Sequence, residues 1–367
     1  MKILIATNHS YMLYQFRREL IAALSKYGNI SVSTPFVGHE DELTSMGCKM
    51  IETKIDRRGV NPASDIRLFL FYLNMFKEEK PDCVITYSIK PNIYASFACR
   101  CLSIPCYINV QGLGSAFQKE PIAAVVSYMY KIALKKVHTV FFENEENKKV
   151  FINKGIINNS KCCVLNGAGV NVEKYTYSDY PSDENGLHFS FLGRIMKEKG
   201  IEEFFFAAEI LKHRYGSFVT FNVVGNLEDE YRNQIDELQT KEVITYHGFQ
   251  PDPIPYYQAS HCIVLPSYHE GMSNVLLEAA SIGRAIITTD IPGCREVVEN
   301  GASGFLCNSH SVESLIACLE RFIQQNEEGR KKMGQLGRMK IEREFNKNLV
   351  IKKTLSCFEF SKNNINL

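Results

Sequence analysis

The sequence has no apolar run long enough to cross a membrane. Hydrophobic residues make up 45% of its 367 positions, but no uninterrupted apolar stretch approaches the roughly 18 residues that a spanning helix needs. The chain opens with the mostly apolar residues 1–6, and Asn8-His9-Ser10 follows too early for a secretory signal peptide. We therefore expect a cytoplasmic protein.

The cysteines lack the spacing of a metal site. Twelve are scattered through the chain, and no Cys-x2-Cys pair is followed by a second pair of ligands. Several fall in apparent strands or helices, where a thiol behaves as a small apolar side chain; Cys83, Cys262 and Cys318 are examples. We expect reduced cysteines, no metal and no cofactor.

The net charge is close to zero, but the charged residues are unevenly distributed. The formal charge is +1, yet residues 1–175 hold 22 Lys and Arg against 15 Asp and Glu, and the remainder holds 20 against 26. A basic half favours an anionic partner, such as a phosphate group or an acidic membrane surface, although chance patterning explains the same numbers. We expect no nucleic-acid partner.

Short β-branched runs alternate with amphipathic helical runs along nearly the whole chain. This pattern predicts an α/β protein with parallel sheets, and the length predicts two domains. The expected strands are 2–6, 29–35, 49–55, 82–87, 105–110 and 138–142, then 187–192, 218–224, 243–247, 262–265, 285–289 and 304–307. The periodicity breaks near 166–186, which separates an N-terminal domain (1–172) from a C-terminal one (183–345). A final helix within 346–367 is expected to pack back on the first domain.

Two acidic residues follow the fourth expected strand of the second half. Glu270 lies on the loop after that strand, and Glu278 lies in the next helix, which Ser273 is expected to cap. The first backbone amides of that helix suit anionic or hydroxyl oxygens; they belong to Met272, Ser273 and Asn274. This combination suits a ligand that is part sugar and part diphosphate. The simpler alternative is a helix whose Glu278 side chain faces solvent.

Cations follow the first expected strand of the second half. Arg194 and Lys199 flank a short loop there and are able to neutralise a diphosphate leaving group, although surface cations near turns are common. A third polar loop, 290–296, follows another strand. Because the carboxyl ends of parallel strands share one edge, three such loops together indicate a ligand site better than any one of them.

These loops resemble the retaining glycosyltransferases of family 4, which have the GT-B fold of two Rossmann-like domains. Their Glu-x7-Glu signature lies in a PSxxEGxxNxxLEAxxxG block, which matches Pro266 to Gly283. Three more patterns are similar: TDxPGxxExVxxGxxG at Thr289 to Gly304, GRxxxxKG at Gly193 to Gly200, and Arg-x6-Phe at Arg338 to Phe345. The resemblance covers most of the second half.

The resemblance implies a site for a nucleotide sugar. Glu270 is expected to contact the donor sugar hydroxyls, Glu278 the nucleotide ribose, and Arg194 and Lys199 the diphosphate. The other expected donor-binding residues are Gly193, Gly271, Met272, Ser273 and Asn274. Family members retain the anomeric configuration of the donor and need no metal, which implies a UDP-sugar as co-substrate without a cofactor.

Four segments of the first half resemble a subgroup that extends polyprenyl-diphosphate-linked sugars in capsule, O-antigen or glycoprotein glycan assembly. The segments are 56–62, 86–94, 109–117 and 141–144. Members of this subgroup commonly use UDP-activated N-acetylhexosamines or related sugars. Cations and glycines here suit a lipid diphosphate; the expected acceptor-binding residues are Lys90, Asn92, Arg57, Arg58, Gly112, Gly114 and His9.

The first half departs from the family at one position. Many members place a His near the end of the fourth strand of the first domain, where this chain has Tyr87-Ser88-Ile89-Lys90. The nearest candidates are His9, on the first loop of the same edge, and His138. A lone His is more often structural than catalytic.

Two helical runs of the first half mix apolar and cationic residues. The run 121–136 has no acid after Glu120 and suits an anionic membrane, or else it is an ordinary helix that covers the sheet. The same alternatives apply to 67–76. We expect peripheral binding to the inner face of the cytoplasmic membrane. Transfer to a soluble acceptor, sugar-nucleotide epimerisation and non-catalytic binding of a sugar nucleotide are the competing functions.

Overall fold

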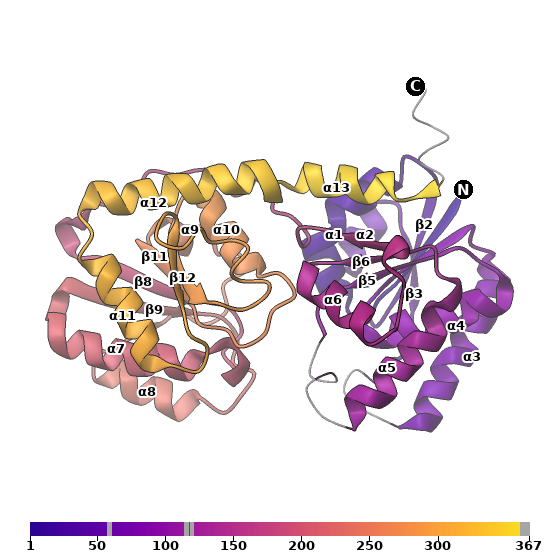
Figure 1. Cartoon of the computed structure of the whole chain (residues 1–367), viewed down its shortest axis with the longest axis horizontal. Helices are drawn as coiled ribbons and strands as arrows, with labels where there is room; N and C mark the ends of the chain where they lie inside the picture. The colour runs from indigo at the N-terminus through magenta and orange to yellow at the C-terminus, as the bar shows by residue number, and fades with distance from the viewer. Residues whose placement is uncertain (57–60, 114–116, 118–120, 360–367) are drawn as a thin grey trace. The chain divides into compact units, whose positions relative to one another are not determined.

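The structure is a computed structural model, and the residues that it describes are 1–56, 61–113, 117 and 121–359. By its internal contacts the chain divides into two compact units. The first contains Met1–Ala168 and the residues from Val350 onward, and the second contains Gly169–Leu349. Each unit has one parallel sheet with helices on its faces (Figure 1).

In the described part of the first unit the sheet has seven parallel strands, in the order β3-β2-β1-β4-β5-β6-β7. They are β1 (Lys2–Ala6), β2 (Asn29–Thr34), β3 (Lys49–Glu52), β4 (Cys83–Tyr87), β5 (Cys106–Val110), β6 (Thr139–Phe142) and β7 (Cys162–Val164). Successive side chains of a strand point to opposite faces, so Ile3 and Ile5 enter one core while Leu4 and Ala6 enter the other. The sheet is therefore buried on both faces.

Helices cover the two faces unequally. The face of Ile3 and Ile5 packs against α1 (Ser10–Leu24) and α2 (Glu40–Ser45), together with Val350 and Phe358 from the end of the chain. The helices on the opposite face are α3 (Pro62–Glu79), α4 (Ile89–Leu102), α5 (Ile122–Ala133) and α6 (Glu145–Asn153). A short 3-10 turn, η2 (Leu134–Lys136), continues α5.

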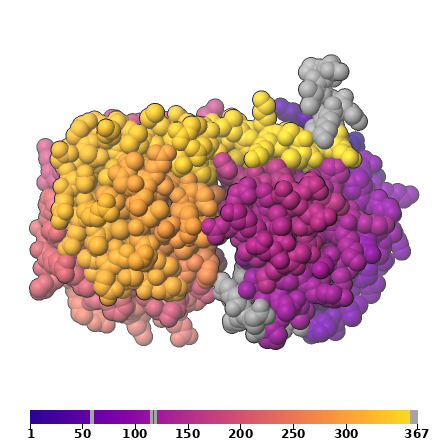
Figure 2. Space-filling view, viewed as in Figure 1, coloured from indigo at the N-terminus to yellow at the C-terminus, as the bar shows by residue number. Residues whose placement is uncertain are grey.

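The second unit has six parallel strands in the order β10-β9-β8-β11-β12-β13. The strands are β8 (Leu187–Leu192), β9 (Val219–Val224), β10 (Thr245–Tyr246), β11 (Cys262–Leu265), β12 (Ala285–Thr289) and β13 (Gly304–Cys307). The helices are α7 (Ile201–Tyr215), α8 (Arg232–Thr240), α9 (Ile254–Gln258), α10 (Asn274–Ile282), α11 (Val312–Ile323), α12 (Glu327–Lys340) and α13 (Lys347–Ser356), the last of which continues into the first unit. The orange and yellow residues late in the chain form most of the surface of this unit seen in Figure 2.

The predicted α/β class with two parallel sheets is confirmed. Every expected strand region contains a strand, although several strands are shorter than expected. The sequence did not predict β7, whose three half-buried residues are too few to form a recognisable alternation. Among the described helices, none is both long enough and apolar enough to cross a bilayer.

Candidate active site

The predicted donor-site residues lie on loops that follow neighbouring strands of the second sheet. Residues 193–200 follow β8, residues 266–273 follow β11 and residues 290–296 follow β12. These strands are adjacent and parallel, so the three loops meet at the carboxyl edge of the sheet. The strand order reverses between β8 and β11, which is where open α/β sheets form their ligand crevices.

Two glycines allow these loops to touch. Gly200 has a φ of 72°, and a Cβ atom on it would lie 2.0 Å from the carbonyl oxygen of Pro266. Gly293 has a φ of 84°, and a Cβ atom there would lie 2.6 Å from the carbonyl oxygen of Gly271. Only glycine fits such positions without displacing the neighbouring backbone. The three loops therefore form one connected surface.

Lys199 and Glu270 form an ion pair between the first two loops. Lys199 Nζ lies 2.5 Å from Glu270 Oε1, and the Ser267 hydroxyl donates to the same oxygen at 3.0 Å. The exposed fractions of the two side chains in the pair are only 16% and 11%. Since charge interactions strengthen away from bulk water, this pair holds a cation and a carboxylate in defined positions.

Arg194 reaches the same edge but is more exposed. Its Nη1 lies 3.7 Å from Oε2 of Glu228, and 53% of its side chain is exposed. An exposed pair at this distance contributes little free energy, so Arg194 is able to turn toward an anionic ligand. Gly193 precedes it with a φ of 141° and donates its amide to the Val224 carbonyl at 3.0 Å.

One backbone amide at the N-terminus of α10 is already hydrogen-bonded within the protein. Ser273 is the N-cap residue, as predicted, but its hydroxyl makes no capping hydrogen bond. Its amide donates to the Gly293 carbonyl at 2.9 Å, so this amide is already used. Within the described chain, the amides of Met272 and Asn274 have no hydrogen-bond acceptor, which leaves them as donors for a ligand.

Glu278 lies further along α10, with its carboxylate against buried tyrosines. The Tyr257 hydroxyl, on a side chain that is 1% exposed, donates to Glu278 Oε2 at 2.8 Å. Burial raises the pKa of Glu278, and hydrogen bonds from Tyr257 and Tyr175 offset part of that rise. A carboxylate held in this way argues against the alternative of a helix residue that merely faces solvent.

Several residues that support the loops were missed by sequence reasoning. The Tyr268 hydroxyl donates to both carboxylate oxygens of Glu203 at 2.6 and 2.8 Å, and its amide donates to the Glu198 carbonyl at 2.9 Å. Tyr268 occupies an unspecified position of the PSxxEG block. Glu203 and Tyr257 lie outside every matched block, so only their tertiary contacts identify them.

Two of the described acceptor-site residues, Lys90 and Asn92, are engaged within the first unit. Lys90 Nζ lies 2.8 Å from Oδ1 of Asp65, and the side chains are 15% and 19% exposed. Asn92 is 2% exposed, and its side chain is hydrogen-bonded to Thr86, Asn109 and Tyr130. We therefore assign Asn92 to holding β4 and β5 in place, not to ligand contact.

Of the other predicted acceptor-site residues, two lie at the carboxyl edge of the first sheet and three lie outside the described residues. His9 precedes α1 and Gly112 follows β5, so both lie at the carboxyl edge of the first sheet. Arg57, Arg58 and Gly114 lie outside the described residues. His138 directly precedes β6 and lies at the opposite edge, so it does not replace the family's His.

The chemistry that this arrangement supports is electrostatic. In the described ranges, no group of three or more His, Cys, Asp or Glu side chains is arranged to hold a metal ion. Lys199, Arg194 and the first amides of α10 are suited to stabilise a departing diphosphate. The carboxylates of Glu270 and Glu278 are suited to accept hydrogen bonds from hydroxyl groups.

Together, the two Rossmann-like units and this charged edge define a glycosyltransferase of the GT-B fold. Solved structures share that fold. The crystal structure of Anabaena HepE with UDP and glucose matches with a TM-score of 0.79 and 16% identity, over 98% of this chain and 100% of that one. The lipopolysaccharide outer core galactosyltransferase WaaB matches with a TM-score of 0.74 and 18% identity, over 99% and 100% of the two chains.

The family follows from matches to both units. The model described as "Glycosyl transferases group 1" matches residues 178–340, and that described as "Glycosyl transferase 4-like" matches residues 2–144. The two models together match most of the chain, which is a glycosyltransferase, an enzyme of the transferase class. The resemblance inferred from the sequence motifs is confirmed.

Characterised relatives are similar along most of their length. An N,N'-diacetylbacillosaminyl-diphospho-undecaprenol alpha-1,3-N-acetylgalactosaminyltransferase of Campylobacter jejuni is 26% identical, over 86% of this chain and 87% of the relative. The capsular polysaccharide biosynthesis glycosyltransferase CapM of Staphylococcus aureus is 27% identical over 80% of each chain. A UDP-Gal:alpha-D-GlcNAc-diphosphoundecaprenol alpha-1,3-galactosyltransferase of Escherichia coli is 26% identical over 72% of each.

Proposed function

We propose that this protein is a retaining glycosyltransferase that moves a sugar from a UDP-sugar to a polyprenyl-diphosphate-linked acceptor. The donor sugar is an N-acetylhexosamine or a related sugar, and the product belongs to a surface polysaccharide or another glycan. The observation that carries the donor half is the Lys199–Glu270 pair, held at 2.5 Å where three loops meet.

The relatives support the acceptor half and the choice of nucleotide. Two of them are named for acceptors linked to diphosphoundecaprenol. One of these is named for UDP-Gal, and the matching structure of HepE contains UDP. A lipid-linked acceptor explains why a protein of this family would work at a membrane surface.

Each donor-site residue has a separate task in this proposal. Lys199 and Arg194 stabilise the negative charge that develops on UDP as the glycosyl–phosphate bond breaks, with the Met272 and Asn274 amides beside them. Glu270 orients the donor sugar through its hydroxyls, and Glu278 binds the ribose. Since cations and amides stabilise the leaving group, no metal ion is required.

We further propose peripheral binding to the inner face of the cytoplasmic membrane. In the described chain, α3 and α5 expose apolar side chains of Ile66, Leu70, Phe71, Val125 and Tyr128. The segment 121–136 contains three lysines and no acidic residue. Exposed apolar side chains next to cations suit an anionic membrane surface.

The proposal is tested with purified protein, a panel of UDP-sugars and a polyprenyl-diphosphate glycan extracted from membranes, by measuring UDP release and glycolipid product. UDP release should depend on the acceptor and persist in EDTA. Glu270→Ala should lower turnover by roughly 100-fold or more, because the donor sugar loses its orienting carboxylate. Glu198→Ala, which removes an exposed carboxylate from the neighbouring loop, is the matched control.

Other outcomes would contradict specific parts of the proposal. Full turnover by Glu270→Ala would remove that residue from the site. Conversion of the UDP-sugar without any acceptor would indicate an epimerase. Equal rates on free oligosaccharide would replace the lipid-linked acceptor with a soluble one, and loss of activity in EDTA would contradict metal independence.

A further inference from the structure

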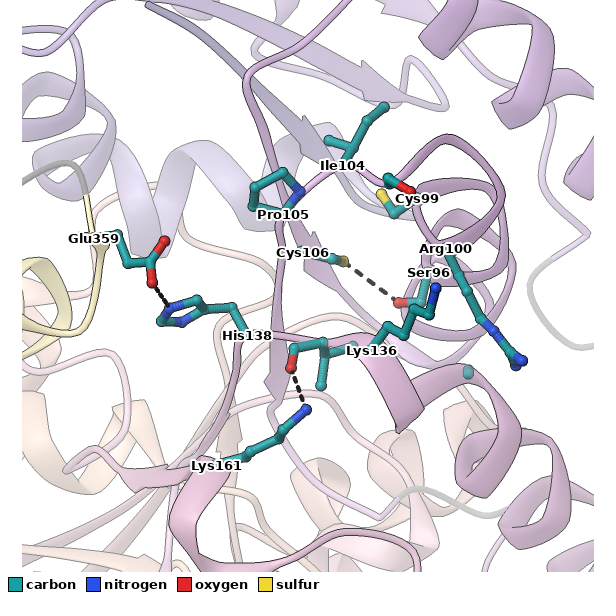
Figure 3. Close-up of a pocket in the computed structure, with 13 residues that line it drawn as sticks. Ser96, Cys99, Arg100, Ile104, Pro105, Cys106, Lys136, His138, Lys161 and Glu359 are labelled. Carbon is teal, nitrogen blue, oxygen red and sulfur yellow. Dashed lines mark hydrogen bonds and ion pairs between the residues drawn. The ribbon is translucent and has the colours of Figure 1, made fainter.

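A pocket lies at the edge of the first sheet where β5 and β6 begin, opposite the carboxyl edge of the same sheet. It is bounded by residues that precede β5 and β6, among them Pro105 and His138, and by the C-terminal ends of α4 and α5 (Figure 3). Its volume is about 430 Å³, within the roughly 300–1,000 Å³ that is typical of small-molecule sites. The pocket belongs to a single unit and contains none of the predicted catalytic residues.

Three cations line the pocket. Arg100 comes from α4, Lys136 from η2, and Lys161 from the turn before β7. In the described part of the chain, none of the three forms an ion pair. Arg17, Lys90 and Lys148 of the same unit have carboxylate partners at 2.7 to 3.2 Å, whereas other exposed cations of the unit, such as Lys26, also lack an ion pair in the described chain. What distinguishes Arg100, Lys136 and Lys161 is that they line one pocket.

Among the described residues that line the pocket, the one acidic side chain is turned away from these cations. Glu359 Oε1 lies 2.9 Å from His138 Nε2, and Figure 3 shows this pair on the side of the pocket opposite Arg100 and Lys136. Arg100 and Lys136 line the pocket on the same side as Ser96 in this view. Cations that line one pocket, with no ion pair among the described residues, favour an anionic ligand.

Hydrogen bonds to backbone carbonyls account for the positions of two of the cations but not for that of the third. Arg100 Nη1 donates to the Ile132 carbonyl at 3.3 Å, and Lys161 Nζ donates to the Val137 carbonyl at 2.9 Å. Ile132 lies in the last turn of α5 and Val137 directly follows η2, so both cations lie near the C-terminal end of a helix, where cations are favourable. Arg100 still has further N–H groups for a ligand. Lys136 donates to no acceptor in the described chain, so the helix end does not account for it.

We propose that this pocket binds the phosphate group of an anionic phospholipid. The reason to choose a lipid over a soluble phosphate is α5, which leads directly into the pocket. Val125 and Tyr128, then Lys131 and Lys135, follow one another at helical spacing along its exposed side. Apolar side chains followed by cations suit the interface and headgroup layers of a membrane.

The proposal names the lipid partner of the membrane contact inferred above and rests on that part of the proposed function. Phosphate binding at this edge would hold the first unit on the membrane while leaving its carboxyl edge free for the acceptor. It involves no step of sugar transfer, so membrane binding and catalysis can be measured separately.

The test is vesicle flotation with the full chain, using phosphatidylcholine vesicles with and without phosphatidylglycerol. Phosphatidylglycerol should strengthen binding of the wild type. Lys136→Gln should weaken that binding about fivefold, and adding Arg100→Gln should bring the loss to roughly 20-fold or more, because each basic residue near an anionic surface contributes about fivefold. Lys26→Gln, an exposed lysine of the same unit without an ion pair in the described chain, should change binding by less than about twofold.

Two further measurements identify the source of the phosphate and separate binding from catalysis. Calorimetry with glycerol 3-phosphate tests the soluble alternative. If this probe binds the wild type while phosphatidylglycerol adds nothing to vesicle binding, the lipid proposal is overturned. An equal loss in Lys136→Gln and Lys26→Gln also overturns it, since that result indicates diffuse surface charge.

UDP release with detergent-dispersed acceptor checks the proposed function independently. Lys136→Gln should retain the wild-type rate and melting temperature in this assay, because the side chain is exposed. A protein that binds phosphatidylglycerol through Lys136 but releases no UDP with any donor would contradict the proposed function and support the pocket. A protein that is active but shows no preference for phosphatidylglycerol would contradict the pocket alone.

Discussion

At the carboxyl edge of the second sheet, Lys199 and Glu270 lie 2.5 Å apart on loops that touch through glycines. At the carboxyl edge of the first sheet, Lys90 is paired with Asp65, and Asn92 is buried in hydrogen bonds. Both sheets are parallel and both reverse their strand order once, between β1 and β4 and between β8 and β11. The same topology therefore supports a compact charged site in one unit and an edge of internally paired residues in the other.

This difference fits what we propose that each unit binds. A nucleotide diphosphate is the same in every donor of a given nucleotide, so it can be recognised by fixed loops that follow adjacent strands. An acceptor glycan varies, and residues that recognise it are spread over separate loops. Here two described members of that second set, Lys90 and Asn92, also contact other residues of the unit. The predictions below test whether this contrast between the two edges holds.

The largest expected effect is at the second edge. Lys199→Gln should lower kcat by roughly 100- to 1,000-fold, the usual result of removing one group that stabilises the leaving charge. Steady-state UDP release measures it. Lys197→Gln is the matched control, because that lysine lies on the same loop, is 63% exposed and is 3.4 Å from Glu202. Similar losses in both variants would mean that only the total charge of the loop matters.

The contact between the loops should matter for stability as well as activity. In Gly200→Ala the new methyl group meets the Pro266 carbonyl, so we expect a loss of roughly 1–3 kcal/mol from overpacking, in addition to about 1 kcal/mol for a left-handed alanine. Thermal unfolding and UDP release measure the two consequences. Gly248→Ala, with a φ of 69° and no atom within 4 Å of the new methyl group, should show only the smaller backbone cost. Equal destabilisation of the two variants would argue against the contact.

At the first edge, Lys90 and Asp65 should respond in opposite directions. If Lys90 serves the acceptor diphosphate, Lys90→Gln raises the acceptor KM by about tenfold, through the loss of one charge-assisted hydrogen bond. Asp65→Asn should lower the acceptor KM, because it releases the ammonium group from its ion pair. Acceptor titrations at saturating donor measure both. A lower melting temperature in both variants with unchanged acceptor KM would make the pair purely structural.

The smallest effect concerns the ribose contact and its pH dependence. Burial raises the pKa of Glu278 above the usual value of about 4.3 for glutamate. As the pH falls through this raised pKa, the carboxylate becomes protonated, and donor binding should weaken. Tyr257→Phe removes a hydrogen bond to the carboxylate, which should raise the donor KM about two- to tenfold and move the fall to higher pH. Measuring the donor KM as a function of pH tests both expectations. Tyr256→Phe, at the neighbouring position, should leave the profile unchanged.

Sequence reasoning predicted the elements and the donor edge well because both depend on local patterns. Buried parallel strands appear as short apolar runs, and glycines and prolines separate them from the loops. The Glu270 and Lys199 loops could be placed at one edge since each directly follows such a run. The strand β7 was missed, because three half-buried residues form no pattern.

The partners of these residues could not be predicted in the same way. Glu270 lies 71 residues from Lys199, and Tyr257 lies 21 residues from Glu278, with no shared motif to connect either pair. The Ser273 amide was expected to face a ligand, yet the Gly293 carbonyl accepts its hydrogen bond. Lys90 was assigned to the acceptor without any local signal that Asp65 would pair with it.

The amino-acid sequence by itself determined the α/β class, the two parallel sheets and the loops that carry the donor residues, because short apolar runs and the turn residues between them act over a few positions. Only the tertiary structure decided which charges pair, which amides remain available, and which side chain orients another, because those depend on close approach of distant segments. It also decided that Arg100, Lys136 and Lys161 share a pocket, although they come from three separate elements.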